Sequence, residues 1–261
     1  MKLKYIVLNT VALASISQIA LAATIQHAPK DNVIRVYGPG GPHTAIIHAA
    51  KAFEKETGHK VEVTFGPQSR WTDSAQKNAD LIFGSSEQSM TAFVENYAFI
   101  SDDIVEPIYI RPAVLAVQKG NPKNIRGFND LLSQPVKIIV TEGKGVYNTS
   151  GTGVWEDVAG RLGSLQDVKN IRSKIVSYEK GSGASFRAFQ KYKADAWITW
   201  SHWPLTHKDK VDMVEIEPER RIYRDLTVAP TTNADPQTLT FIKFLKSDKA
   251  LPYFKAEGWK R

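Results

Sequence analysis

The chain contains no cysteine in its 261 residues. This absence excludes disulfide bonds, thiol nucleophiles, thiolate zinc sites and iron–sulfur clusters. It also excludes a lipid anchor, which needs a cysteine at the processing site. Long apolar runs are missing as well. The longest one, residues 5–21, is interrupted by five polar side chains, whereas a membrane-spanning helix needs about 20 predominantly apolar residues.

Sequence motifs of the common enzyme classes are also missing. The chain has no G-x-S-x-G, no H-E-x-x-H, no G-x-x-x-x-G-K-[ST] and no G-x-G-x-x-G. Its six histidines show no spacing typical of metal ligands. We therefore expect a protein that is not an enzyme and needs no metal or cofactor. A Ser/His/acid triad assembled across separate loops stays open, because such triads are recognised by geometry.

The N-terminus has the features of a secretory signal over residues 1–22. Lys2 and Lys4 precede the interrupted apolar run, and Ala20 and Ala22 flank Leu21 in a small-x-small cleavage site. The alternative, a membrane anchor, would require a cleaner apolar segment. We predict cleavage before Ala23 and export to a bacterial periplasm, where a chain without cysteine folds without oxidation.

The positive charge of the chain is modest and dispersed. Lys and Arg number 34 against 27 Asp and Glu, a formal net charge of +7, and loss of the leader removes two lysines. No basic tract with interleaved aromatic residues supports nucleic-acid binding. We interpret the excess as a mild attraction that steers small anions toward the protein.

Along the rest of the chain, β-type runs alternate with helical patterns, which predicts an α/β fold with a largely parallel sheet. In the first helix, residues 46, 49, 50 and 53 are apolar and share one face, with a start near Pro42 and a stop at Gly58. Strands are predicted at residues 33–37, 60–65, 79–83, 113–118, 136–141, 175–178, 195–200 and 226–229. Further helices are predicted at residues 69–77, 152–162, 184–189 and 236–245.

Four loops rich in Gly, Ser and Thr each follow a predicted strand and precede a helix. They are residues 38–44, 66–69, 84–89 and 148–153. Helix N-termini offer free N–H groups to anions, and ligands of open α/β sheets bind at the carboxyl ends of strands. Each loop alone could be an ordinary capped turn. Four of them together favour an anion-binding site.

Three single residues keep two interpretations each. His43 stands at a helix start and could contact an anion or serve the structure. Arg111 could be a surface arginine or a bidentate clamp for carboxylate or phosphate. For Trp197, in the tryptophan-rich tract 195–203, packing in the core is the favoured interpretation.

Five segments in order along the chain carry a family resemblance. They are residues 37–44, 65–68 with Trp71, 80–89, 148–157 and 195–200. Together they resemble the accessory colonization factor AcfC family of periplasmic proteins. That family is related to major antigenic, adhesin-like periplasmic proteins and, more distantly, to molybdate- and sulfate-type binding proteins. The resemblance covers nearly the whole chain after the leader.

The resemblance implies a type II periplasmic binding-protein fold, with two α/β lobes, two crossing hinge segments and a ligand between the lobes. Lobe one would comprise residues 23–110 and 225–261, and lobe two residues 111–224. A homodimer is implied as well. By position, the implied ligand contacts are His43, Thr44, Gln68, Ser85 and Ser86 in lobe one, Arg111 at the crossover, and Thr149, Ser150, Gly151 and Thr152 in lobe two.

The favoured hypothesis is therefore a solute-binding protein that closes around a small anion such as phosphoglycerate, citrate, sulfate or molybdate, with a membrane transporter as a possible partner. Two alternatives remain. One is an adhesin or colonization factor with a vestigial cleft. The other is a hydrolase that uses loop residues.

Overall fold

The computed structural model describes residues 31–142 and 153–261 of the chain. The predicted signal sequence, residues 1–22, lies outside the described residues. So do four of the predicted ligand contacts, Thr149, Ser150, Gly151 and Thr152. None of the helices in the described part combines the length and apolar character needed to cross a lipid bilayer.

Strands and helices alternate along the described chain, as the sequence predicts. The strands are β1 (Val33–Gly38), β2 (Lys60–Phe65), β3 (Leu81–Gly84), β4 (Glu106–Gln118), β5 (Ile138–Thr141), β6 (Ile175–Glu179), β7 (Ala196–Trp200), β8 (Val211–Glu215) and β9 (Tyr223–Pro230). The α-helices are α1 (His43–Thr57), α2 (Thr72–Asn78), α3 (Glu87–Asn96), α4 (Phe128–Ser133), α5 (Val154–Ala159), α6 (Leu165–Lys174), α7 (Ser182–Lys191), α8 (His202–Thr206), α9 (Gln237–Leu245) and α10 (Leu251–Lys255).

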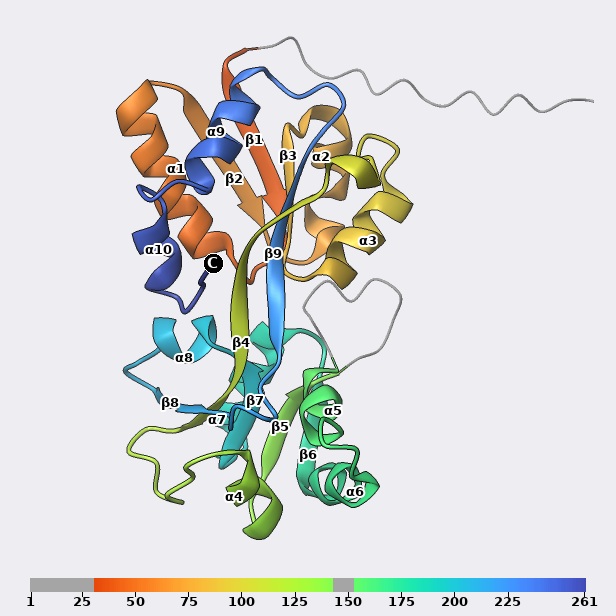
Figure 1. Cartoon of the computed structure of the whole chain (residues 1–261), viewed down its shortest axis with the longest axis vertical. Helices are drawn as coiled ribbons and strands as arrows, with labels where there is room; N and C mark the ends of the chain where they lie inside the picture. The colour runs from red at the N-terminus through yellow and green to blue at the C-terminus, as the bar shows by residue number, and fades with distance from the viewer. Residues whose placement is uncertain (1–30, 143–152) are drawn as a thin grey trace, which may run out of the picture.

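Two long neighbouring strands join the two halves of the molecule. The strand order is β2-β1-β3-β9-β4-β7-β5-β6, and β8 also pairs with β4. Strands β4 and β9 are antiparallel and run side by side through the middle of the molecule (Figure 1). Each crosses one of the predicted lobe boundaries, which themselves stay a prediction. The two strands therefore form the connection between a β1–β3 half and a β5–β7 half.

The sheet is mixed, which corrects the prediction of a largely parallel one. Strands β1, β2 and β3 pair in parallel, as do β5, β6 and β7. Every pairing that involves β4 or β9 is antiparallel. The reason is topological: the chain enters lobe two along β4 and returns along β9, so the two connecting strands run in opposite directions.

Each half has its own apolar cores on the two faces of its sheet. In lobe one, helices α1, α9 and α10 cover one face, while α2 and α3 cover the other (Figure 1). In lobe two, α4, α5 and α6 pack against one face and α7 against the other. The side chains of Trp197 and Ile198 on β7 pack into the cores on opposite faces of the sheet, and both are fully buried. This confirms the core interpretation for Trp197.

Element boundaries differ from the prediction where a local break was overlooked. The helix predicted at 152–162 is the shorter α5, and a separate α6 follows after Gly163, whose φ of 74° is left-handed. The helix predicted at 69–77 is a 3-10 turn at Gln68–Arg70 followed by α2. Helix α1 begins after Pro42 and ends at Gly58, as predicted.

Candidate functional site

Arg111 lies on β4 at the point where β4 and β9 pass from one lobe to the other, called the crossing point below. Its register partner on β9 is Arg224. Its side chain is buried, with 1% of its surface exposed. The guanidinium carbon lies 4.5 Å from the ring centre of Trp259 and 5.1 Å from that of Trp200. Cation–π attraction of this kind stabilises a charge that has lost its water. The surface-arginine interpretation of Arg111 is therefore wrong.

The guanidinium of Arg111 contacts residues from both halves of the molecule. Its Nη2 donates to the carbonyl oxygen of Ser85, 3.1 Å away at the end of β3. Its Nη1 lies 2.8 Å from Nδ1 of His202, at the start of α8 in lobe two. Among the described residues, Nε of Arg111 has no hydrogen-bond partner. Arg111 thus links loop 84–89, the connecting strand β4 and the first residue of α8.

A buried carboxyl group lies near this charge. Glu257 is 5% exposed, and the backbone of Ala45, in the first turn of α1, favours its charged form. Burial raises the pKa of Glu257 to about 7, against the opposing effects of Ala45 and Arg111. Burial lowers the pKa of Arg111 to about 9, so Arg111 stays charged at neutral pH.

His202 is a buried neutral base. Burial holds its pKa well below the ordinary value of 6.5, and repulsion from Arg111 and His43 lowers it further. His202 and His43 belong to different lobes, and the charge of each disfavours protonation of the other. The sequence analysis did not select His202, which the structure places against Arg111. The available signal was its position two residues after the predicted strand 195–200, within the tryptophan-rich tract 195–203.

The first predicted loop approaches Arg111 through its backbone. A Cβ atom added at Gly41 would lie 3.0 Å from Nη1 and 3.3 Å from Nη2 of Arg111. His43 is half-buried, bonds to the carbonyl oxygen of Gly40 and stacks on Phe65 with 3.8 Å between ring centres. Burial lowers the pKa of His43, so its imidazole is neutral at pH 7. The Thr44 hydroxyl lies 3.3 Å from Nε2 of His43.

In the third predicted loop, residues 84–89, internal hydrogen bonds cap the N-terminus of α3. The Oγ of Ser89 accepts from the backbone N–H groups of Ser85 at 2.8 Å and Ser86 at 3.1 Å. The Ser86 side chain in turn accepts from the Ser89 N–H. The N–H of Glu87 donates to Asp225 of β9, 2.8 Å away. These N–H groups at the start of α3 therefore serve the protein itself.

Gln68 of the second loop points into lobe one. Its side-chain amide donates to the hydroxyl of Tyr97 over 2.8 Å, and the same hydroxyl lies 2.8 Å from Oγ1 of Thr72. Tyr97 belongs to an apolar core of lobe one. Arg111, Ser85 and the backbone of Gly41 are thus brought together, while Gln68 is held by a different neighbour.

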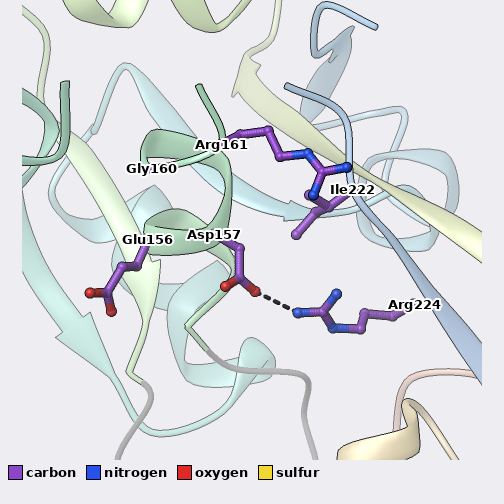
Figure 2. A pocket seen from close by; sticks show the side chains of 6 residues that line it. All are labelled: Glu156, Asp157, Gly160, Arg161, Ile222 and Arg224. Carbon is purple, nitrogen blue, oxygen red and sulfur yellow. Dashed lines mark hydrogen bonds and ion pairs between the residues drawn. The ribbon is translucent and has the colours of Figure 1, made fainter. Parts of the chain in front are cut away.

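An open cavity of about 450 Å³ lies between α5 and the entry to β9. Glu156, Asp157 and Arg161 line it from the α5 side, and Arg224 lines it from β9 (Figure 2). Asp157 and Arg224 form an ion pair with 2.5 Å between their atoms. Arg224 is also the register partner of Arg111 on β4, so one wall of this polar cavity belongs to the connecting strands. Within residues 31–142 and 153–261, no cluster of three or more potential metal ligands occurs.

Comparisons with known proteins agree on one class. The family described as bacterial extracellular solute-binding protein matches residues 34–260. Peb3 from Campylobacter jejuni is 41% identical, with a TM-score of 0.82 over 87% of this chain and 99% of that chain. PEB3 with bound L-phospholactate, also 41% identical over the same shares of the two chains, has a TM-score of 0.83.

More distant structures share the fold. The sulfate-binding protein SubI from Mycobacterium tuberculosis H37Rv is 17% identical, with a TM-score of 0.70 over 87% of this chain and 86% of that chain. At this identity the likeness concerns the fold alone. No curated protein sequence matches the chain. Together with the mixed sheet and the two connecting strands, these likenesses confirm the predicted type II binding-protein fold.

Proposed function

Because the chain belongs to the bacterial extracellular solute-binding protein family, we propose that it captures a small anion between its lobes by hinge closure. The anion class comprises phosphorylated three-carbon acids, citrate and inorganic oxyanions. PEB3 with bound L-phospholactate, 41% identical, supports a phosphorylated carboxylic acid. The proposed location is the periplasm, reached through cleavage of residues 1–22.

One observation carries this proposal: the buried Arg111, on a strand that connects the lobes, contacts residues of both lobes. A ligand between the lobes would meet a charge that water no longer screens, and charge-assisted hydrogen bonds are roughly twice as strong as neutral ones. Besides Arg111, the proposed ligand contacts are His43, Thr44, Ser85 and Ser86 from lobe one, Gln68 from the second loop, and Thr149, Ser150, Gly151 and Thr152 from lobe two.

The first test is a panel of ligands measured by thermal shift and calorimetry. We expect L-phospholactate, phosphoglycerate, citrate, sulfate or molybdate to raise the melting temperature, because a ligand that binds only the folded state adds stability. At a free concentration 100 times Kd the gain is about 2.7 kcal/mol. An unchanged melting temperature with the whole panel would reject anion capture and favour the adhesin with a vestigial cleft.

A matched pair of glycine variants tests whether Arg111 is involved. Replacing Arg111 itself would disturb packing of both lobes, so Gly41→Ala is the milder change. Its Cβ would press on a guanidinium that hydrogen bonds and tryptophan rings hold in place. We expect anion affinity to fall about 3- to 30-fold. Gly40→Ala, which has no neighbour within 4 Å, is the control, and equal affinities in both variants would contradict the placement.

The proposal also includes three more specific features that the family resemblance implies. They are membership of the AcfC group, a homodimer and a membrane transporter as partner. Light scattering after size exclusion tests the homodimer, since a monomer mass at micromolar concentration rejects it. The relatives are binding proteins, which supports binding without catalysis. Recovery of chemically altered ligand after long incubation would instead favour the hydrolase.

A further inference from the structure

The hydrogen bond between Arg111 and His202 determines which nitrogen of the imidazole carries the proton. A guanidinium has N–H donors and no acceptor. Nδ1 of His202 lies 2.8 Å from Nη1 of Arg111, so Nδ1 must present its lone pair. In a neutral imidazole the hydrogen then sits on Nε2. His202 is therefore the Nε2–H tautomer, with one nitrogen accepting and the other free to donate.

The donating nitrogen of His202 has no counterpart in the described part of the chain. Nε2 is buried and lacks a hydrogen-bond partner among the described residues, and the residue is only 5% exposed. Nε of Arg111 is in the same condition. Buried polar groups without a partner are uncommon in folded proteins and costly. Here two N–H donors on side chains that contact each other share that condition, and so does Nε1–H of Trp259, whose ring packs on Arg111.

We infer that His202 is a ligand contact of lobe two: its Nε2–H donates to an oxygen of the anion while its Nδ1 orients Arg111. This inference rests on the proposed function and adds a residue to its site. Both donors can pair only with an acceptor, which suits an ionised phosphate, sulfate or carboxylate oxygen.

Two substitutions separate the roles of the two nitrogens. In His202→Asn the amide oxygen can take the place of Nδ1 and accept from Arg111, but no donor reaches the position of Nε2. In His202→Gln the longer amide can place an N–H near Nε2, but Arg111 loses its acceptor. Titration calorimetry with L-phospholactate and with sulfate, alongside His48→Gln on the exposed side of α1, measures the affinities.

We expect His202→Asn to weaken binding about 10- to 100-fold, as for loss of a hydrogen bond to a charged group. His202→Gln should lose less, and His48→Gln should bind like the unmodified protein. Affinity of His202→Asn equal to that of the unmodified protein would overturn the inference, since His202 would then act only through Arg111. Losses in His202→Gln equal to or larger than those in His202→Asn would overturn it too.

A measurement on the unmodified chain covers the case in which the variants do not fold. Nitrogen-15 NMR of the imidazoles at pH 7.5 should show His202 as the Nε2–H tautomer, with a shifted Nε2 resonance after L-phospholactate is added. A proton on Nδ1, or an Nε2 resonance unmoved at saturation, contradicts the inference. If no anion of the panel binds the unmodified protein, the proposed function is rejected, and the inference that His202 contacts the anion is rejected with it. The tautomer of His202 is then still measured independently of binding.

Discussion

Arg111 and Glu257 show how one buried neighbourhood sets the charge of its residues. Arg111 keeps its charge at neutral pH although burial lowers its pKa to about 9. Glu257 is more finely balanced, because burial raises its pKa to about 7 while Ala45 and Arg111 favour the carboxylate. An anion bound near Arg111 would compete with the Glu257 carboxylate for the same positive charge. The charge state of Glu257 therefore belongs to the chemistry of the site.

Glu257 predicts a pH dependence of stability. The folded protein holds the proton of Glu257 more tightly than the unfolded chain, whose glutamate has a pKa near the ordinary 4.5. This residue therefore lowers the free energy of unfolding as pH rises from about 4.5 to about 7. We expect Glu257→Gln to be more stable than the unmodified protein at pH 8, on the order of 1–2 kcal/mol.

Urea unfolding at pH 5 and pH 8 measures this effect. The difference between Glu257→Gln and the unmodified protein should be small at pH 5 and larger at pH 8. His202 titrates with the opposite sign, because its lowered pKa stabilises the folded state above pH 6.5 and that contribution is lost on acidification. Comparing Glu257→Gln with the unmodified protein at the same pH cancels the contribution of His202, which is present in both. A difference that does not grow with pH would contradict the raised pKa.

At the scale of elements, backbone N–H groups at the start of α3 are paired with side chains of the protein itself. Ser89 accepts two backbone N–H groups, and Asp225 accepts a third from β9. Gly84 at the end of β3 fits because a Cβ there would lie 2.5 Å from Oγ1 of Thr227. A loop rich in Gly and Ser thus serves close packing and helix capping in lobe one. Its carbonyl oxygen at Ser85 still reaches Arg111.

The capping role of Ser89 makes a stability prediction. Ser89→Ala leaves the buried N–H groups of Ser85 and Ser86 without that acceptor, and an unsatisfied buried donor costs about 1–3 kcal/mol. We expect the free energy of unfolding to fall by about 2 kcal/mol, measured by urea denaturation. Ser133→Ala, at an exposed hydroxyl in α4, should change it by less than about 0.5 kcal/mol. Similar small effects in both variants would argue against the capping network.

At the scale of the whole molecule, two antiparallel strands connect lobes that have separate cores. A change of backbone angles in β4 and β9 can reorient the lobes without repacking either core, which is the usual form of hinge closure. A ligand would drive the proposed closure only as far as it binds the closed state more tightly than the open one. Arg111, at the crossing, is the residue whose contacts with both lobes would change.

The absence of cysteine allows a direct test of closure, because introduced thiols are the only ones in the chain. Lys51 on α1 and Lys169 on α6 are exposed and lie in different lobes. With dyes on cysteines at these positions, we expect saturating L-phospholactate to raise the transfer efficiency. A pair at Lys51 and Glu95, both exposed in lobe one, should not respond. Unchanged transfer between the lobes, with binding confirmed by calorimetry, would reject hinge closure.

The sequence by itself determined the alternation of strands and helices, the limits of α1 and the core position of Trp197. These depend on local properties, namely side-chain periodicity, proline at a helix start and glycine in a left-handed stop. It also indicated that loops 38–44 and 84–89 lie at strand ends, and the family resemblance supplied the fold. The sequence did not predict the antiparallel pairs of the sheet, because β9 returns beside β4 from a distant part of the sequence.

Only the tertiary structure decided what surrounds Arg111. Ser85 and His202 lie 26 and 91 residues away in sequence, and Trp259 and Glu257 come from the C-terminal end of the chain. Burial, and with it the pKa of Glu257 and the tautomer of His202, follows from these distant neighbours. Local sequence sets which groups can ionise or donate. The packing of both lobes around one arginine sets which of them do.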